Sequence, residues 1–211
     1  MKIRNRQFLD LLAGMVDKEI RARYKNTYFG FLWIIVNPVI QMVVIGFVFK
    51  FFIKQNIDYY YYYLFIGLLV WNFFSLSLTK ATPSIVYERS LIKKSKFPRS
   101  VIPLSIIFSN FFNFLVALII FTVPILFLNT TDFMSLVYVL IAFIMLITFT
   151  IGISLLTSAL NVRYRDISFF VQAILMVWFY LNPIVYTLSM IPYRFHWLWR
   201  LNPLTSVFQL M

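Results

Sequence analysis

Amide side chains are the groups in this sequence that could serve a chemical function inside its apolar segments. Asn37, Asn72, Asn110 and Asn113 lie in stretches that are otherwise largely apolar. Asn110 and Asn113 are three residues apart and would share one face of a helix, so they could hydrogen-bond to another helix or line an aqueous path. Amides combined with aromatic rings and without charges suit neutral or polyhydroxylated material, because sugars stack on rings and hydrogen-bond to amides.

Several kinds of catalytic site are missing from the sequence. The five glycines stand apart and none precedes a lysine, so there is no phosphate-binding loop and the chain is not expected to hydrolyse ATP by itself. A single histidine, His196, and the lack of clustered carboxylates argue against a metal site. The seven acidic residues lie in connectors or at the ends of apolar segments. A proton relay through the membrane would therefore lack the carboxylates it needs. We therefore expect no cofactor on this chain, and energy from a partner.

The composition predicts an all-α integral membrane protein. Apolar residues make up 62% of the 211 positions and charged residues 12%, against about 25% charged in soluble domains. Phe and Tyr occur 25 and 13 times, more than interfacial belts require, so some of these rings could line a path. Segments long enough for a spanning helix of about 20 residues are 31–53, 59–79, 104–128, 133–160 and 167–188.

The distribution of basic residues predicts the orientation. Fifteen of the nineteen lysines and arginines lie in 1–30, 80–103 and 161–166, which are alternate connectors. The positive-inside rule then places these three connectors and the N-terminus in the cytoplasm, and 189–211 outside. The basic residues that give the net charge of +12 are thereby explained by the orientation of the chain in the membrane, and nucleic acid is not expected as a partner.

The first thirty residues have the pattern of an amphipathic helix. Phe8, Leu11, Leu12 and Met15 follow helical spacing, and charged residues take the opposite side. We interpret 1–30 as a cytoplasmic interfacial helix on the inner leaflet, and 31–211 as the transmembrane domain. The alternative is a helix that packs on a soluble partner without contacting lipid.

The connector 80–103 could dock a soluble subunit. Residues Ser84 to Leu91 can form a short helix with Ser84 as its N-cap, followed by the basic residues Lys93, Lys94 and Lys96. An element that combines apolar, aromatic and charged residues is suited to docking a soluble subunit. The alternative is a solvated, positively charged loop.

Two aromatic segments belong to the outer side. The run Tyr59 to Tyr63 is compatible with an ordinary aromatic belt or with rings that face protein or a pore. Beyond the fifth segment, repeated prolines interrupt an apolar stretch, which predicts short helices that lie in the outer interface or dip back as a lid.

Motifs spread over nearly the whole chain resemble those of type-2 ABC exporter permeases for polysaccharides, the family of O-antigen, capsule and teichoic-acid export channels. The N-terminal motif consists of Arg23, Tyr24, Lys25, Thr27, Gly30, Trp33, Asn37 and Pro38. A basic segment ends in Phe97-Pro98-Arg99, and a cytoplasmic loop carries Asn161, Tyr164, Arg165 and Asp166. The outer side has Pro183 to Tyr186 and Asn202 to Leu204.

The resemblance implies a homodimer in a bacterial inner membrane, with a channel between the subunits for a lipid-linked glycan. Two copies of a separate cytoplasmic ATPase, which holds ATP and Mg²⁺, would drive it. The coupling residues would be Ser84, Ile85, Tyr87, Glu88, Arg89, Leu91, Lys93 and Lys94. Residues 189–204 would form short outer gate helices. The channel lining would include Tyr59, Tyr63, Trp71, Asn72, Asn110 and Asn113.

The family also ends with a sixth span, so the chain is expected to lack a final span. Two alternatives stay open. The same fold could export a drug or a lipid, or the protein could be a non-transporting scaffold in envelope glycan assembly.

Overall fold

A computed structural model describes residues 5–25, 27–52, 60–94, 97–126 and 133–210, and the regular elements in these ranges are all helical. The prediction of an all-α protein is confirmed. The longer helices are α1 (Asn5–Tyr24), α2 (Trp33–Phe52), α3 (Tyr60–Tyr87), α5 (Val101–Leu126), α6 (Phe133–Arg163) and α7 (Ile167–Leu181). The short ones are η1 (Gly30–Leu32), α4 (Arg89–Lys94), η2 (Leu188–Met190), η3 (Tyr193–Phe195), α8 (His196–Arg200) and α9 (Pro203–Leu210).

Four helical segments are long and apolar enough to cross a membrane: Gly30–Phe49, Tyr60–Tyr87, Val101–Phe121 and Val137–Arg163. The predicted fifth span, 167–188, is helical only over Ile167–Leu181. That helix is about 22 Å long at 1.5 Å per residue, which is shorter than the roughly 30 Å of a hydrocarbon core. It ends where Asn182 adopts an extended backbone ahead of Pro183.

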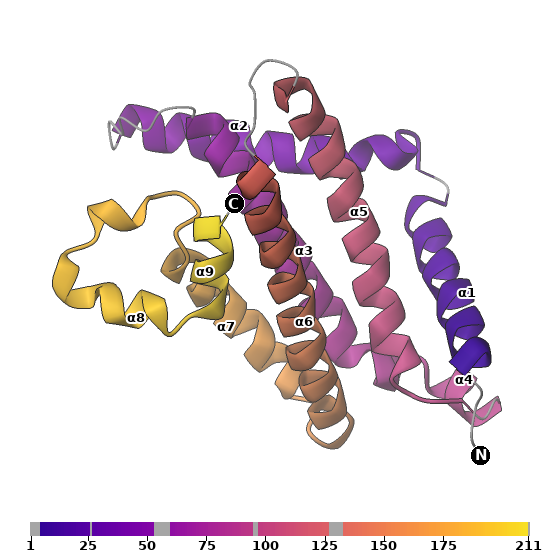
Figure 1. Ribbon diagram of the computed structural model, residues 1–211. Coiled ribbons are helices and arrows are strands. Elements are labelled where there is room, and N and C mark those ends of the chain that lie inside the picture. Colours follow the sequence, from indigo (N-terminus) through magenta and orange to yellow (C-terminus); the bar gives the residue numbers. More distant parts are fainter. Residues whose placement is uncertain (1–4, 26, 53–59, 95–96, 127–132, 211) are drawn as a thin grey trace.

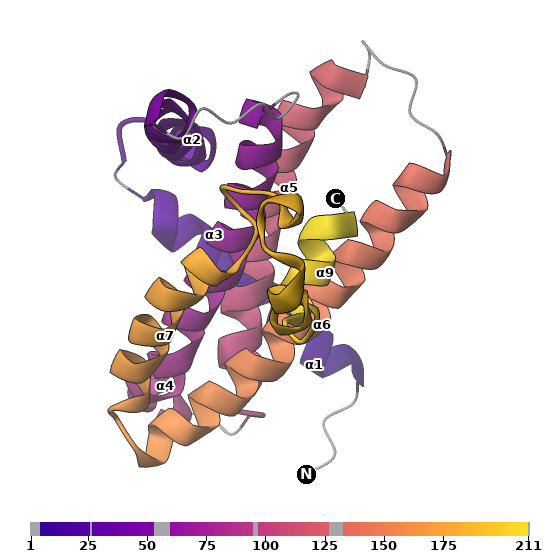
Figure 2. The ribbon, with the colours of Figure 1, turned by 90° about the vertical axis from the view of Figure 1, so that its left-hand side faces the viewer.

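Helices α3, α5 and α6 form the centre of the molecule, and α2 crosses the upper parts of α3 and α5 (Figures 1 and 2). Gly46 allows this crossing, because a Cβ at Gly46 would lie 2.5 Å from Cε1 of Tyr61. Hydropathy predicted the length of α2, but its direction across the bundle comes from this contact and from the packing of Ile34 into the core.

The core is built largely of aromatic rings around α3. Phe65 and Phe74 are completely buried. Phe65 stacks on Phe121 of α5 with ring centres 3.7 Å apart. The ring centre of Phe74 lies 5.7 Å from that of Phe149 on α6 and 5.3 Å from that of Trp178 on α7. Part of the aromatic excess in the sequence therefore serves packing between helices.

Helix α3 continues through Pro83 and ends at Tyr87, so the predicted N-cap at Ser84 is wrong. The Ser84 hydroxyl is buried and donates a hydrogen bond to the carbonyl of Ala81 (2.6 Å). The break falls at Glu88 instead, and α4 follows directly. Burial of this turn against the other helices overrides the local signal that Pro83 and Ser84 provide.

Helix α1 lies beside the first half of α5 (Figure 1). Its predicted apolar face is the one it buries, since Met15 packs with Val101 and Ile102 at the start of α5. Phe8, Leu11 and Leu12 surround this cluster together with Leu91, Ile92 and Phe97. The amphipathic helix is thus confirmed, and its contact with an inner leaflet stays a prediction.

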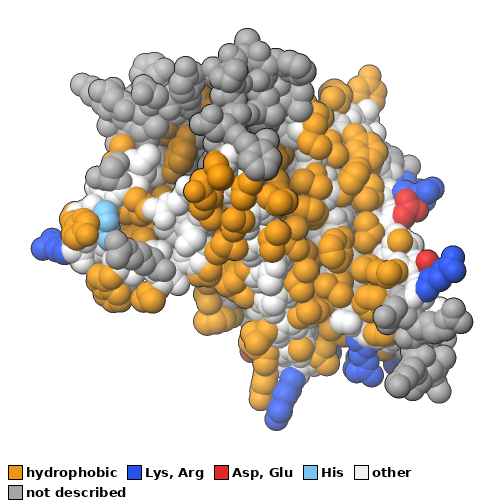
Figure 3. Space-filling model, viewed as in Figure 1, with side chains coloured by type: hydrophobic (Ala, Val, Ile, Leu, Met, Phe, Trp, Pro, Cys, Tyr) orange, Lys and Arg blue, Asp and Glu red, His pale blue; other side chains and the backbone are white. Residues whose placement is uncertain are grey.

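Figure 3 shows the apolar side chains spread across the visible face, with lysines and arginines mainly at its lower and right-hand edges. The lower end holds α4 and the turn between α6 and α7 (Figure 1). Two of the basic connectors therefore lie at one end of the bundle, as the alternating charge pattern predicts.

The chain after α7 runs back against the first part of α3 and reaches α6 through α9. Gly67 permits its approach, because a Cβ there would lie 3.2 Å from Cγ2 of Ile184. The amide of Asn202 donates to Oδ1 of Asn182 (2.8 Å), which ties the start of α9 to the end of α7. The prediction of short helices after the fifth segment is confirmed by η2, η3 and α8.

Candidate functional site: a polar cleft beside the N-terminal motif

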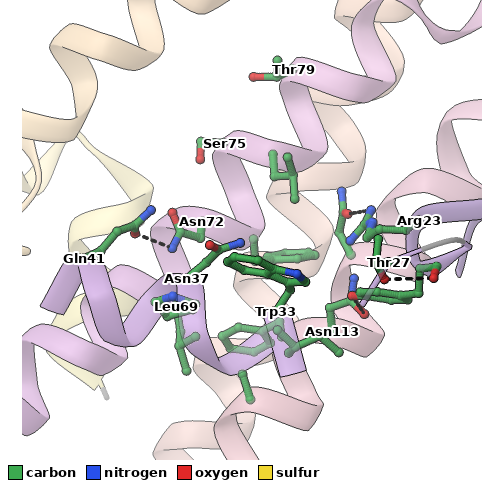
Figure 4. Close-up of a pocket in the computed structure, with 18 residues that line it drawn as sticks. Arg23, Thr27, Trp33, Asn37, Gln41, Leu69, Asn72, Ser75, Thr79 and Asn113 are labelled. Carbon is green, nitrogen blue, oxygen red and sulfur yellow. Dashed lines mark hydrogen bonds between the residues drawn. The ribbon is translucent and has the colours of Figure 1, made fainter. Parts of the chain in front are cut away.

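A cleft of about 490 Å³ lies between the N-terminal motif, α3 and α5 (Figure 4). It joins two groups of residues that are separate in the sequence, the N-terminal motif and the amides of α3 and α5. Its lining consists of Arg23, Tyr24, Thr27, Trp33, Ile34, Asn37, Pro38, Gln41, Leu69, Asn72, Phe73, Ser75, Leu76, Thr79, Asn110, Asn113, Phe114 and Ala117.

Gly30 makes the turn that brings the two parts of the motif to the same cleft. Its φ of +47° lies in the left-handed region, which favours glycine because other residues clash there. The η1 turn begins at Gly30 and leads directly into Trp33, the first residue of α2. The ring of Tyr24 stacks on Phe31 across this turn, with centres 4.5 Å apart.

Arg23 and Tyr24 reach from the end of α1 to the two asparagines of α5. One terminal nitrogen of the Arg23 guanidinium donates to Oδ1 of Asn110, and the Asn110 amide donates to Oγ of Ser77 on α3 (3.1 Å). The Tyr24 hydroxyl donates to Oδ1 of Asn113 (3.1 Å). Burial raises the pKa of the Tyr24 hydroxyl, which keeps it protonated as a donor. Both asparagines therefore tie α1 to α5.

At the other side of the cleft, the amide of Asn72 donates to Oε1 of Gln41 (2.8 Å), which links α3 to α2. Asn37 lies one turn before Gln41 on α2, and Ser75 and Thr79 continue the polar face of α3 beyond Asn72 (Figure 4). Ser75 and Thr79 were not predicted from the sequence as lining residues. Their spacing from Asn72, three and seven residues, is a helical stripe that could have revealed them.

A second cleft, of about 390 Å³, opens on the α7 side of α3 and shares Ser75 and Thr79 with the first. Its other lining residues are Trp71, Gln172, Leu175, Met176, Phe179 and Tyr180. The polar stripe of α3 thus borders both clefts, and Trp71 borders only the second.

Tyr63 lines neither cleft. Its hydroxyl donates to the backbone carbonyls of Pro183 and Tyr186, the latter at 3.0 Å. Tyr60 does the same for the carbonyl of Val185 (3.3 Å). These two members of the tyrosine run therefore hold residues 183–186 on α3, whereas Tyr59 lies outside the described residues.

The residues predicted to couple the chain to an ATPase divide into buried and exposed groups. Ser84 is buried and Ile85 is half-buried inside α3, and Leu91 packs toward α1 and α5. Glu88 lies at the break and forms an ion pair with Lys18 of α1, with Nζ and Oε1 2.8 Å apart. The exposed members are Tyr87, Arg89, Lys93 and Lys94. A soluble partner could reach this second group.

Asn161, predicted to lie in the loop between α6 and α7, instead lies in the last turn of α6 and supports the start of α7. Asn161 is buried, and its Oδ1 accepts a hydrogen bond from the backbone amide of Ser168 (3.2 Å) in the first turn of α7. Tyr164, Arg165 and Asp166 are exposed.

Of the remaining members of the N-terminal motif, Lys25 and Thr27 are exposed, and the Thr27 hydroxyl donates to the carbonyl of Tyr24 (3.0 Å).

Comparison with known proteins agrees with this architecture. The family described as ABC-2 type transporter matches residues 11–211. The chain is 35% identical over 208 residues to the O-antigen export system permease protein RfbA of Klebsiella pneumoniae, covering 98% of this chain and 80% of that protein. It is 32% identical over 185 residues to a protein of the same name from Myxococcus xanthus, covering 88% and 71% respectively. Together with the four apolar helices, these matches show that the chain is a multi-pass membrane protein of the ABC-2 type transporter family.

Proposed function

We propose that this chain is the permease subunit of an exporter that moves a lipid-linked polysaccharide across a bacterial inner membrane. The observation that carries the proposal is the 35% identity over 98% of the chain to an O-antigen export permease. The polar and aromatic cleft supports a glycan, because rings and uncharged amides are the groups that bind sugars. Capsule and teichoic-acid polymers share this chemistry and belong to the same proposal.

The energy would come from a separate cytoplasmic ATPase. No phosphate-binding loop occurs in the printed sequence, so ATP and Mg²⁺ would be held by that partner. Two copies of the permease and two of the ATPase would form the working complex. The exposed side chains of Tyr87, Arg89, Lys93 and Lys94 supply a basic and aromatic surface on which the ATPase could dock.

The N-terminus would lie in the cytoplasm. The three most basic connectors of the chain alternate with poor ones, which is the pattern that the positive-inside rule requires. The outer segment that follows α7 would then lie at the far side of the membrane, where Tyr60 and Tyr63 hold it.

Deletion of the gene tests the function directly. An exporter is expected to leave completed, lipid-linked glycan inside the cell, and expression of the intact gene should restore glycan at the cell surface. Lowered synthesis without trapped polymer would instead indicate a scaffold.

Reconstitution tests the substrate class. The permease and its ATPase are purified together and placed in vesicles, and ATP hydrolysis is measured with the lipid-linked glycan, with the lipid carrier alone and with a set of amphiphilic drugs. Stimulation by the glycan beyond that of the carrier supports polysaccharide export. Stimulation only by drugs or by plain lipids would refute it.

A further inference from the structure

Helix α1 is attached along the first half of α5 by one apolar contact and two hydrogen bonds (Figure 1). Met15 packs on the first turn of α5. At the other end of α1, the Arg23 guanidinium donates to Oδ1 of Asn110. The hydroxyl of the next residue, Tyr24, donates to Oδ1 of Asn113 (3.1 Å). The hydrogen bonds of this attachment therefore lie at one end of α1, and the apolar contact lies about two turns earlier.

The Arg23 bond pairs a charge with a neutral amide. The ion pairs seen among the described residues do not include Arg23. A cation held by an amide is bound less tightly than one held by a carboxylate, because hydrogen bonds between two charged groups are the strong ones. Two buried donors, Nε of Arg23 and Nδ2 of Asn113, also lack an acceptor within the part of the chain that the structure describes. An unmade bond of this kind is unfavourable, so the attachment is weaker than its groups allow.

A competing partner for Arg23 lies on α1 itself. Glu19 precedes Arg23 by four residues, with the acidic residue first, which is the favourable order for an ion pair on one helix. In the structure, Glu19 and Arg23 both interact electrostatically with Lys80 of α3. If α1 moved away from α3 and α5, Glu19 would lose Lys80 and Arg23 would lose its amide. The two would then be free to pair with each other, so α1 has a charge partner in either position.

Helix α1 also joins the proposed docking surface to the cleft. Its residue Lys18 pairs with Glu88 at the break from which α4 begins. At its other end, Arg23 is bound to Asn110, whose amide donates to Oγ of Ser77 on α3 (3.1 Å). Arg23 and Asn110 both line the cleft. A displacement of α4 would therefore reach α1 first, and would reach the cleft wall through the Arg23 bond.

We propose that the Arg23–Asn110 hydrogen bond is a releasable clasp, which holds α1 on α5 while the ATPase is at rest and opens during ATP hydrolysis. Arg23 and Asn110 are then positioning residues of the transport cycle, and the neutral amide is what makes the clasp releasable. The inference rests on the proposed function, because it requires an ATPase that acts on α4.

A single thiol on the buried side of α1 reports the state of the clasp. The sequence has no cysteine, and the Met15 side chain is 7% exposed, so Met15→Cys introduces one protected reactive group. The full permease is reconstituted with a cysteine-free form of its ATPase, and the rate of modification by a membrane-impermeant maleimide is measured. We expect the rate to rise at least about fivefold during ATP hydrolysis. Ala13→Cys, at an exposed position of α1, is the control and should react equally with and without ATP.

Two variants in the Met15→Cys background should act in opposite directions. Asn110→Asp keeps the acceptor for Arg23 but makes it a carboxylate, to which the Ser77 hydroxyl can also donate. The thiol at position 15 should then stay protected during hydrolysis, and the glycan exported per ATP should fall at least about fivefold. Arg23→Gln removes the charge, and the thiol should react rapidly even without ATP. The matched control is Arg21→Gln, whose exposed side chain pairs with Asp17 and which should behave as the unaltered chain does.

Three results would overturn the clasp. The first is a thiol at position 15 that reacts at one rate with and without ATP. The second is equal reactivity in the Asn110→Asp and Arg23→Gln chains, because a merely structural bond would be weakened by both substitutions. The third is unchanged export per ATP in the Asn110→Asp chain.

Failure of the clasp is distinguishable from failure of the proposed function. Glycan trapped after gene deletion, together with a thiol that ATP does not expose, would retain the exporter and refute the clasp. A thiol that ATP does expose, without any trapped glycan, would retain the clasp and refute polysaccharide export.

Discussion

Lys18 of α1 and Glu88 at the α3–α4 break form an ion pair between Nζ and Oε1 at 2.8 Å, across 70 residues of sequence. The contact fixes the amphipathic helix to the junction from which α4 projects. Both side chains keep access to water, with exposed fractions of 53% and 29%, so the pair is expected to add less than about 1 kcal/mol to the free energy of unfolding. Its role would be to position α4 relative to α1.

Reversal of this pair separates positioning from stability. Lys18→Glu or Glu88→Lys alone is expected to reduce the ATP-driven export rate, because like charges would push α1 away from the junction. The double exchange should restore most of the rate. Export in reconstituted vesicles measures the effect, and thermal unfolding of each variant should stay close to that of the unaltered chain. A double variant no better than either single one would contradict the contact's role.

Charge reversal on the exposed side of α4 is expected to weaken docking of the ATPase. Arg89→Glu or Lys93→Glu places a negative charge on the basic surface, and the amount of ATPase that co-purifies with the permease should fall several-fold, more at low salt than at high salt. Arg194→Glu, in η3 among the segments after α7, is the control and should leave co-purification unchanged. Equal recovery of the ATPase with all three variants would refute the docking surface.

Removal of the Tyr63 hydroxyl is expected to loosen the segment that follows α7. Tyr63→Phe keeps the ring and deletes the donor to the carbonyls of Pro183 and Tyr186, which should lower the free energy of unfolding by about 0.5–1.5 kcal/mol. Tyr62→Phe is the control, since that ring stacks on Phe121 with centres 6.1 Å apart and the substitution preserves the stack. Thermal unfolding in detergent and protease cleavage of 182–202 provide the readings. Equal loss in both variants would show that the hydrogen bonds contribute little.

Substitution of Ser84 distinguishes a helix interior from a helix start. An N-cap serine replaced by alanine typically costs about 0.5–2 kcal/mol. Because Ser84 instead donates to the Ala81 carbonyl inside α3, Ser84→Ala is expected to change the free energy of unfolding by less than about 0.5 kcal/mol. Chemical or thermal unfolding of the variant gives this difference, and a loss above 1 kcal/mol would contradict a continuous α3.

Local sequence properties predicted much of the fold. Apolar length predicted the four long helices, and helical periodicity predicted the buried face of α1 around Met15. The same local signals failed at Ser84, where a proline followed by serine resembles a helix start but the turn is buried within α3. They also failed at Ser75 and Thr79, whose hydroxyls are too common in apolar helices to stand out without knowledge of the cleft.

The sequence by itself determined the membrane class, the alternation of basic connectors and the family, because hydropathy, charge and motif spacing are properties of adjacent residues. Only the tertiary structure decided which groups meet. The Arg23 guanidinium finds Asn110 87 residues away, and Tyr63 holds carbonyls more than 100 residues further along. Such partners depend on how α1, α3, α5 and the segment after α7 pack, and that packing decides whether an amide serves as a tie between helices or as part of a cleft.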